Sequence, residues 1–430
     1  MHLNFFFYYI SLIPPTLLVL LPFSLVLGPF LPDLTVVIIS IYFLINIFKK
    51  KYFFLVKNYY FIFFILFCFY LIAISINSTN INLSLSSSLF YFRFGLFALG
   101  VYILLDNYSF IKNYLLYSFF ILFSFLIIDS YFQLIFGYNI MGNPIFQNNR
   151  VTSIFGDEIK LGSFISRLSP IYFGLILLYF KKNKYLFHVF FFIYFISISV
   201  IFLTGERVAF VYIIIAFILL FLTNLQIYKI FLFYILLTFL MILLASFYYP
   251  FLIERMITLT IIQMNLANGL FTNSNYDIIT GDKLIIFSIP HEQHFLTAFK
   301  IFQDNLFFGA GPKMFRELCF YEIYNSGIHS CSTHPHNTYI QLLAETGLIG
   351  FIIIFLIFIY ISYNIIIQIY RAIRYKENFN NKFKFTLYLC IFISLFPLVP
   401  TGNFFNNWLS VIYYLPIGFI LFENIKNNIK

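Results

Sequence analysis

Charged residues are scarce in this sequence: they make up 10% of its 430 residues, whereas 62% are hydrophobic. Roughly a quarter of the residues are charged in an ordinary soluble domain, so this composition excludes a soluble fold. The sequence also lacks a glycine-rich phosphate loop, a Cys-x-x-Cys pair and a His-Glu-x-x-His motif. These absences argue against a nucleotide site and against the commoner zinc sites.

Long apolar stretches are what the sequence has in place of charge. Stretches of about 20 residues, enough to cross a hydrocarbon core of roughly 30 Å, recur from end to end. The first begins almost at Met1 without a basic leader or a small-residue cleavage site, so we expect it to be retained. We predict an all-α polytopic membrane protein, a single integral membrane domain over 1–430, with about twelve transmembrane helices at 5–27, 33–48, 59–76, 89–105, 114–136, 161–180, 185–203, 208–223, 229–248, 338–369, 385–400 and 408–423.

Basic residues predict the orientation of these helices. The net charge of +10 could suggest nucleic acid, but the basic residues form short clusters between the apolar stretches. With the N-terminus inside, the short cytoplasmic segments hold sixteen Lys and Arg, and the opposite short segments hold four, Arg150, Lys160, Arg167 and Arg207. Because such a bias keeps basic segments in the cytoplasm, both termini should be cytoplasmic and no nucleic-acid partner is expected.

One connection is far longer than the usual few residues: the segment 249–336 between the ninth and tenth helices. This topology places it on the extracytoplasmic side. It contains five of the seven histidines, namely His291, His294, His329, His334 and His336. We therefore expect the functional site in this loop.

The end of the loop carries the most informative stretch, where histidines run into a helical pattern. Pro335 disfavours helix before it and Asn337 is a good N-cap, so His336 should lie at the mouth of a helix, a place that suits an anionic phosphate. Asn337, Gln341 and Glu345 recur every four residues and share one helix face. The alternative is that Gln341 and Glu345 merely contact solvent and that the histidines are ordinary loop residues.

The pair His336-Asn337, followed after nine residues by Gly347-Leu-Ile-Gly350, resembles the signature of the O-antigen ligase and polymerase family. Two further segments are similar to that family: Leu306–Gly311, and the turn Thr204–Arg207 between the seventh and eighth helices. The resemblance covers about residues 200–350. It implies a multi-pass glycosyltransferase of the bacterial inner membrane that acts on the periplasmic face in lipopolysaccharide assembly.

In that family a histidine at the end of the large loop is essential for transfer, and the resemblance gives this role to His336. The other residues of the motif would support it: His334, Asn337, Gln341, Glu345, Gly347 and Gly350. The implied donor is a polyprenyl-diphosphate-linked glycan, and the implied acceptor is lipid A-core or a growing polysaccharide. Because diphosphate is already a good leaving group, no cofactor is expected. His336 would be the general base of an inverting, metal-independent transfer.

Arginine suits the binding of the diphosphate because a guanidinium grips phosphate oxygens with two N–H groups. Arg207, at a helix end, is the first candidate, although a lone basic residue there can also snorkel to the membrane surface. The second arginine that many ligases carry falls near His291 in this sequence. His291, Arg255 and Arg316 are therefore the other candidates, and this departure keeps open a polymerase that joins repeat units.

A transporter or lipid flippase and a zinc protein are the two alternative classes of function. A transporter or lipid flippase also fits twelve helices, but here the polar residues concentrate in one outer loop rather than at the midplane. Zinc held by the loop histidines and cysteines is disfavoured, because His291 and His294 are three residues apart and no Cys-x-x-Cys is present. We expect no metal.

Arg93 is a charge inside the expected fourth helix. A charge within the membrane is unfavourable unless it faces a partner or a cavity. Asp129, in the expected fifth helix, is the partner that we predict.

Cys319 and Cys331 differ from Cys68 and Cys390 because they alone lie outside the apolar stretches. Both lie on the side assigned to the oxidising compartment, where disulfides persist. We predict that they form a disulfide closing a small subloop before His336, with two unpaired thiols as the alternative.

Overall fold

The computed structural model describes residues 2–146, 150–178, 183–266, 285–375 and 379–428, and within these ranges the chain is helical and has no strand. Every expected transmembrane segment has a helical counterpart. These counterparts are α1 (His2–Leu27), α2 (Phe30–Ile47), α3 (Tyr59–Ile76), α5 (Phe92–Asn107), α6 (Ile111–Phe136), α7 (Leu161–Leu177), α8 (Lys184–Leu203), α9 (Arg207–Thr223), α10 (Tyr228–Tyr248), α15 (Thr338–Tyr375), α16 (Phe379–Ser394) and α17 (Asn407–Asn428). Short helical segments connect them: η1 (Lys50–Leu55), α4 (Ile81–Ser88), η2 (Ser153–Phe155) and η3 (Leu225–Ile227).

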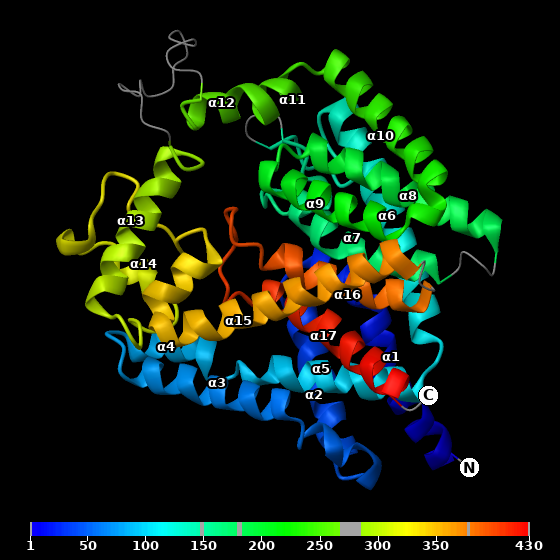
Figure 1. Cartoon of the computed structure of the whole chain (residues 1–430), viewed down its shortest axis with the longest axis horizontal. Coiled ribbons are helices and arrows are strands. Elements are labelled where there is room, and N and C mark those ends of the chain that lie inside the picture. Colours follow the sequence, from blue (N-terminus) through cyan, green and yellow to red (C-terminus); the bar gives the residue numbers. More distant parts are fainter. Residues whose placement is uncertain (1, 147–149, 179–182, 267–284, 376–378, 429–430) are drawn as a thin grey trace.

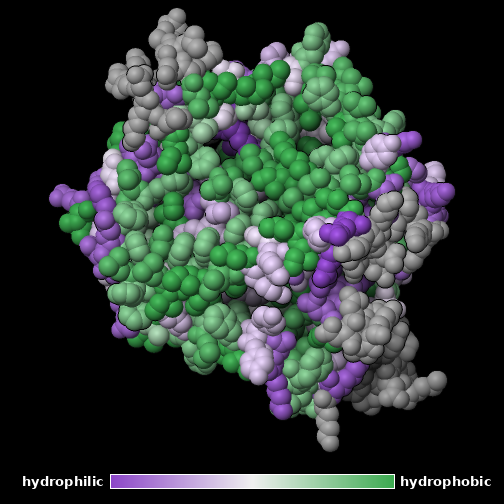
Figure 2. Space-filling model, in the orientation of Figure 1, coloured by the Kyte–Doolittle hydropathy of each residue, from purple (hydrophilic) through white to green (hydrophobic). Residues whose placement is uncertain are grey.

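The helices are those of a multi-pass membrane protein. Among the described residues, eight are long and apolar enough to cross a membrane: α2, α3, α4 with α5, α6, α8, η3 with α10, α15 and α17. Three shorter apolar helices accompany them, Ser11–Leu27, Leu161–Leu177 and Arg207–Thr223. Hydrophobic residues cover most of the visible face of the molecule (Figure 2). The exact count of twelve spans stays a prediction.

The later part of the long loop and the ends of the chain lie at opposite ends of the molecule. Helices α3, α5, α15 and α17 run along its long axis, with α13 (Ile289–Asp304) and α14 (Phe315–Leu318) at one end and the start of α1 and the end of α17 at the other (Figure 1). Glycines permit close approach of neighbouring helices, because a Cβ at Gly418 would meet the Ala98 carbonyl oxygen at 2.7 Å and one at Gly100 the Ile39 carbonyl oxygen at 2.6 Å.

Two sequence predictions are wrong in this part of the fold. The helix expected at 385–400 ends at Ser394, because prolines at 397 and 400 follow in a segment that leaves the helix. Arg93 pairs with Asp33 at 3.2 Å, not with Asp129. The buried Asp129 carboxylate instead accepts hydrogen bonds from the Ile140 amide, at 2.8 Å, and from the Ser153 hydroxyl.

The described part of the long loop is largely helical. After α10 come α11 (Phe251–Ile253), a π-turn at Glu254–Thr258 (η4) and α12 (Leu259–Gln263), and α13, α14 and η5 (Glu322–Tyr324) follow later. A small hydrophobic cluster joins α13, α14 and η5 to the start of α15: Ala298, Ile301, Met314, Phe315, Leu318, Cys319, Tyr324 and Ala344. The loop is thus packed onto the helix that begins at the sequence motif.

Candidate functional site

A break inside α15 holds the two glycine motifs together. Gly347 has φ 61° and ψ −168°, which interrupts the helix, and a Cβ there would overlap the Phe307 carbonyl group. The segment 306–311 fills the break: the amides of Ala310 and Gly311 donate to the carbonyls of residues 344 and 345 at 3.0 and 2.9 Å. In return the amides of residues 348 and 349 donate to the carbonyls of residues 306 and 307 at 2.9 and 3.3 Å. The freed backbone groups of a broken helix are satisfied in this way.

The start of α15 fixes the backbone of His336. The Asn337 side chain accepts hydrogen bonds from the amides of Tyr339 and Ile340 at 3.0 and 3.2 Å, which confirms the predicted N-cap. His336 itself has φ 58°, a left-handed conformation that is uncommon outside glycine. The amide of Thr401 donates to the His336 carbonyl at 2.7 Å and holds that conformation.

The polar face of α15 is buried rather than exposed to solvent. Asn337 donates to the carbonyl of residue 397 at 2.8 Å, and Gln341 donates to Asn403 and to Glu345, each at 2.9 Å. Gln341 and Glu345 are both fully buried, and Glu345 accepts from the Phe315 amide at 3.3 Å. The three residues therefore tie α14 and the segment 397–404 to the helix, and the idea that they merely contact solvent is wrong.

Four histidines meet at the mouth of α15. The ring centroid of His336 lies 4.2 Å from that of His334, 5.2 Å from that of His294 and 5.7 Å from that of His291. His291 and His294 come from α13, one turn apart, and His334 and His336 come from the segment before α15. His329, the fifth histidine of the loop, is exposed. The structure thus brings the predicted base into the centre of a cluster.

The cluster keeps its rings neutral. Burial lowers the pKa of His336 to about 3, and the neighbouring His334, His291 and His294 lower it further. Burial is also the main reason why the pKa values of His334 and His291 fall to about 4. At neutral pH these imidazoles are therefore unprotonated, and an anion that binds beside them would raise their pKa values.

The turn between α8 and α9 gathers three arginines. The Arg150 guanidinium donates through Nε to the Thr204 carbonyl at 3.1 Å. Arg255 lies over Gly205, where an added Cβ would meet Arg255 Cδ at 2.7 Å and Nε at 2.8 Å. Burial, together with the positive charges of Arg255 and Arg207, lowers the pKa of Arg150 to about 10. Such a concentration of positive charge is favourable once an anion binds.

Arg207 joins α9 to α12 and faces the histidines. Its guanidinium donates to Thr260 Oγ1 at 3.0 Å and to Gln263 Oε1 at 2.7 Å, so it does not simply snorkel. Its charge also contributes to the lowered pKa of His291. Figure 2 shows a recess with hydrophilic residues between α12 and α9, surrounded by hydrophobic surface. The effect of the Arg207 charge on His291 relates the arginines to the histidine cluster.

Glu206 is the carboxylate at this turn. It accepts hydrogen bonds from the amides of Gly162 and Ser163 at 2.8 and 3.0 Å, so it caps the N-terminus of α7. Burial raises the pKa of Glu206 to about 7, although these amides and the charge of Arg150 oppose that effect. One partly neutralised carboxylate leaves the three arginines with a net positive charge.

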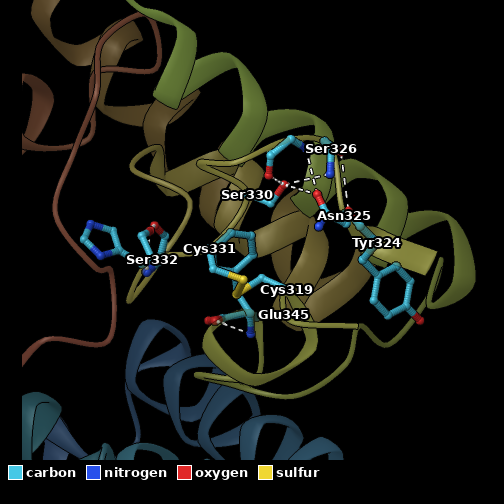
Figure 3. Close-up of a disulfide and its surroundings, with 11 residues drawn as sticks. Cys319, Tyr324, Asn325, Ser326, Ser330, Cys331, Ser332 and Glu345 are labelled. Atoms are coloured by element: carbon cyan, nitrogen blue, oxygen red, sulfur yellow. Dashed lines mark hydrogen bonds between the residues drawn. A yellow bond between two sulfur atoms is a disulfide. The ribbon is translucent and has the colours of Figure 1, made fainter. Parts of the chain in front are cut away.

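Arg316 and the disulfide lie on the other side of the histidines. Arg316 donates to the Thr333 carbonyl at 3.3 Å, and its charge acts on His334 rather than on the other arginines. Cys319, at the end of α14, is joined to Cys331 in a disulfide with Cα atoms 5.1 Å apart (Figure 3). Residues 325–330 close the subloop through hydrogen bonds, including Ser330 Oγ to Asn325 Oδ1 at 2.9 Å. The subloop is thus fixed directly before the histidine segment.

The histidines and cysteines of the long loop are the side chains that could ligate a metal ion. Across the described residues, no three His, Cys, Asp or Glu side chains are placed to hold a metal ion. Cys319 and Cys331 are joined to each other, so neither offers a thiolate.

Sequence reasoning missed Arg150 and Thr401 as parts of the site. Arg150 was counted only as a charge in a short loop, and its proximity to Thr204 comes from the fold. Thr401 carries no signal of its own, yet its carbonyl also accepts from His334 Nε2 at 3.2 Å. Both belong to loops distant in sequence from the motif.

Comparison with protein families confirms the resemblance. Residues 190–355 match the family model described as O-antigen ligase. The match contains the four clustered histidines, Arg207, Arg255, Arg316 and both disulfide cysteines, whereas Arg150 and Thr401 lie outside it. No curated protein matches the chain.

Proposed function

Because residues 190–355 carry the region characteristic of O-antigen ligases, we propose that this membrane protein transfers a glycan from a polyprenyl diphosphate to an acceptor hydroxyl. The reaction takes place at the periplasmic face of the bacterial inner membrane, and both termini are cytoplasmic. Members of this family act in O-antigen assembly on lipid-linked glycans, with polysaccharide or lipid A-core substrates. His336 is the general base, and the arginines bind the diphosphate.

The observation that supports this proposal most is the electrostatic effect of Arg207 on His291, which relates a set of arginines to a set of histidines. A partly buried set of three arginines, Arg150, Arg207 and Arg255, lies next to a set of neutral histidines, with His291 close to both. The first set suits the diphosphate, whose phosphates are both ionised, because guanidinium forms charge-assisted hydrogen bonds to phosphate oxygens. The second set suits removal of a proton from a hydroxyl group.

The chemistry follows from this arrangement. The acceptor oxygen attacks the anomeric carbon, the bond from that carbon to the diphosphate breaks, and its electron pair leaves on the phosphate oxygen. His336 takes the hydroxyl proton, and attack opposite to the leaving group inverts the anomeric carbon. Because a nearby anion favours the protonated imidazole, bound diphosphate raises the pKa of His336 from its unliganded value of about 3. The donor therefore activates its own base.

His336→Ala is the central test. Purified protein is mixed with a synthetic polyprenyl-diphosphate glycan and an acceptor glycolipid, with excess EDTA in a parallel reaction. We expect wild-type transfer with and without EDTA, no transfer by His336→Ala, and normal transfer by the control His188→Ala, whose ring lies in α8 beside Tyr234 and outside the site. Transfer by His336→Ala would contradict the role of the base, and loss of transfer with EDTA would contradict metal independence.

The acceptor separates ligase from polymerase. The polymerase alternative rests on the place where many ligases carry a second arginine, which falls near His291 in this sequence. Deletion of the gene followed by a glycolipid gel distinguishes them: lipid-linked polymer that accumulates while lipid A lacks long glycan indicates a ligase, and single repeat units on lipid A indicate a polymerase. A transporter or flippase would show no transfer in the purified assay.

A further inference from the structure

One ring nitrogen of His294 lacks a hydrogen-bond partner among the residues that the structure describes. The side chain is 7% exposed, and its ring donates a hydrogen bond to the backbone carbonyl of Cys331. Nδ1 is buried and has no hydrogen-bond partner among the residues that the structure describes, so the bond to Cys331 is made by Nε2. Nδ1 of the neutral ring is therefore an acceptor. A buried acceptor without a partner is energetically unfavourable, so its presence needs a physical explanation.

The neighbours of His336 are not equivalent. His334 is nearest, but both of its nitrogens are engaged: Thr333 Oγ1 lies 2.9 Å from Nδ1, and Nε2 donates to the Thr401 carbonyl at 3.2 Å. His291 Nδ1 lies 2.7 Å from Ser288 Oγ. Within the described part of the cluster, His294 alone offers a buried ring nitrogen without a partner, in a ring 5.2 Å from that of His336.

We propose that His294 Nδ1 receives the proton that His336 takes from the acceptor hydroxyl, so that the two histidines form a proton relay. This inference rests on the proposed transfer reaction. The O–H bond of the acceptor breaks as its oxygen bonds the anomeric carbon, and the proton moves to His336. From there it passes, directly or through one water molecule, to His294 Nδ1 and then to the departing diphosphate, which leaves with the electron pair. Proton, electron pair and leaving group are thereby all accounted for.

The surroundings of His294 favour brief protonation of its ring over a lasting positive charge. The Cys331 carbonyl accepts from Nε2 in both protonation states and favours the imidazolium, and the disulfide to Cys319 fixes that carbonyl. Burial acts in the other direction and lowers the pKa of His294. The groups that face the ring are His336, His291, His334, His329 and the ring of Phe315. None of these is an anion, so the proton is passed on.

His294→Gln tests the relay, because a glutamine amide can still donate to the Cys331 carbonyl but cannot take a proton. We expect kcat to fall by about a hundredfold or more, with KM for the donor nearly unchanged. His188→Gln, whose ring lies in α8 beside Tyr234 and outside the site, should keep the wild-type kcat. In His294→Ala, added imidazoles should restore transfer in the order of their basicity, which a merely structural role would not produce.

A measurement on the wild-type protein tests the relay without relying on variants that fold correctly. Rates in mixtures of H₂O and D₂O should curve downward with deuterium content if two protons move in the relay, and should be linear if His336 acts alone. A linear plot, or wild-type kcat in His294→Gln, would overturn the relay while leaving the proposed function intact. Absence of transfer by the wild-type protein, or transfer by His336→Ala, would instead overturn the proposed function and the relay with it.

Discussion

Substitution of Gly347 by alanine should separate the two halves of the site. Gly347 occupies a backbone region that is essentially restricted to glycine, and forcing alanine into it costs about 1–3 kcal/mol. The added Cβ would also overlap the carbonyl group of Phe307, so the segment 306–311 must move away. Four backbone hydrogen bonds depend on that contact, each contributing about 1 kcal/mol. The total loss should be about 5 kcal/mol.

Gly137→Ala is the matched control for this experiment. Gly137 also has a left-handed backbone, with φ 82°, but nothing lies within 4 Å of an added Cβ. It should therefore lose only the conformational part, about 1 kcal/mol. Thermal unfolding in detergent should show a fall in Tm on the order of 10 °C for Gly347→Ala and a much smaller one for Gly137→Ala. Transfer activity should be lost with the first and kept with the second. Equal losses of Tm would refute the argument that the glycine permits the backbone contact.

Three further predictions concern the charges and the crosslink. Arg207→Ala should raise KM for the donor by about tenfold to a hundredfold in the transfer assay. Arg207→Lys should lower KM only part of the way back to the wild-type value, since an ammonium cannot form two parallel hydrogen bonds. A wild-type KM in Arg207→Lys would mean that a positive charge alone suffices. The double variant Cys319→Ser/Cys331→Ser should lose about 3 kcal/mol of stability in unfolding measurements. Mass spectrometry of the non-reduced wild-type protein should show the two cysteine peptides linked, and two alkylatable thiols would contradict the disulfide. The pKa values of His334 and His336 are about 4 and 3 in the folded protein against about 6.5 when unfolded, so as pH falls from about 6.5 to 4 these two residues gain protons only in the unfolded chain. They therefore contribute a loss of stability across that window, which the raised pKa of Glu206 opposes. Tm of His334→Gln/His336→Gln should fall less steeply than wild-type Tm over this range, and parallel slopes would contradict the lowered pKa values.

The sequence predicted elements better than it predicted partners. Apolar stretches and the N-cap at Asn337 depend on neighbours a few residues away, and these appear in the structure as expected. The Pro-containing end of the helix expected at 385–400 was overextended because its residues remain hydrophobic past Ser394. A hydrophobic pattern cannot by itself show where a helix stops.

The difference between predicting helices and predicting their partners is larger for polar residues. A period of four places Gln341 and Glu345 on one face, but it does not distinguish a face covered by another segment from one that meets water. Arg93 was matched to a carboxylate in the next expected helix, whereas its partner Asp33 lies 60 residues away in α2. Such choices depend on which helices become neighbours, and the order of helices along the chain does not determine that.

The contact between Thr401 and His336 has a consequence for biosynthesis. Thr401 lies between the last two helices and is synthesised sixty-five residues after His336. The histidine segment is therefore made before the amide that donates to the His336 carbonyl is present. The left-handed backbone at His336 gains this hydrogen bond only once the connection between α16 and α17 has been made. In a chain that stops before this connection, the proposed base would therefore lack the hydrogen bond from Thr401.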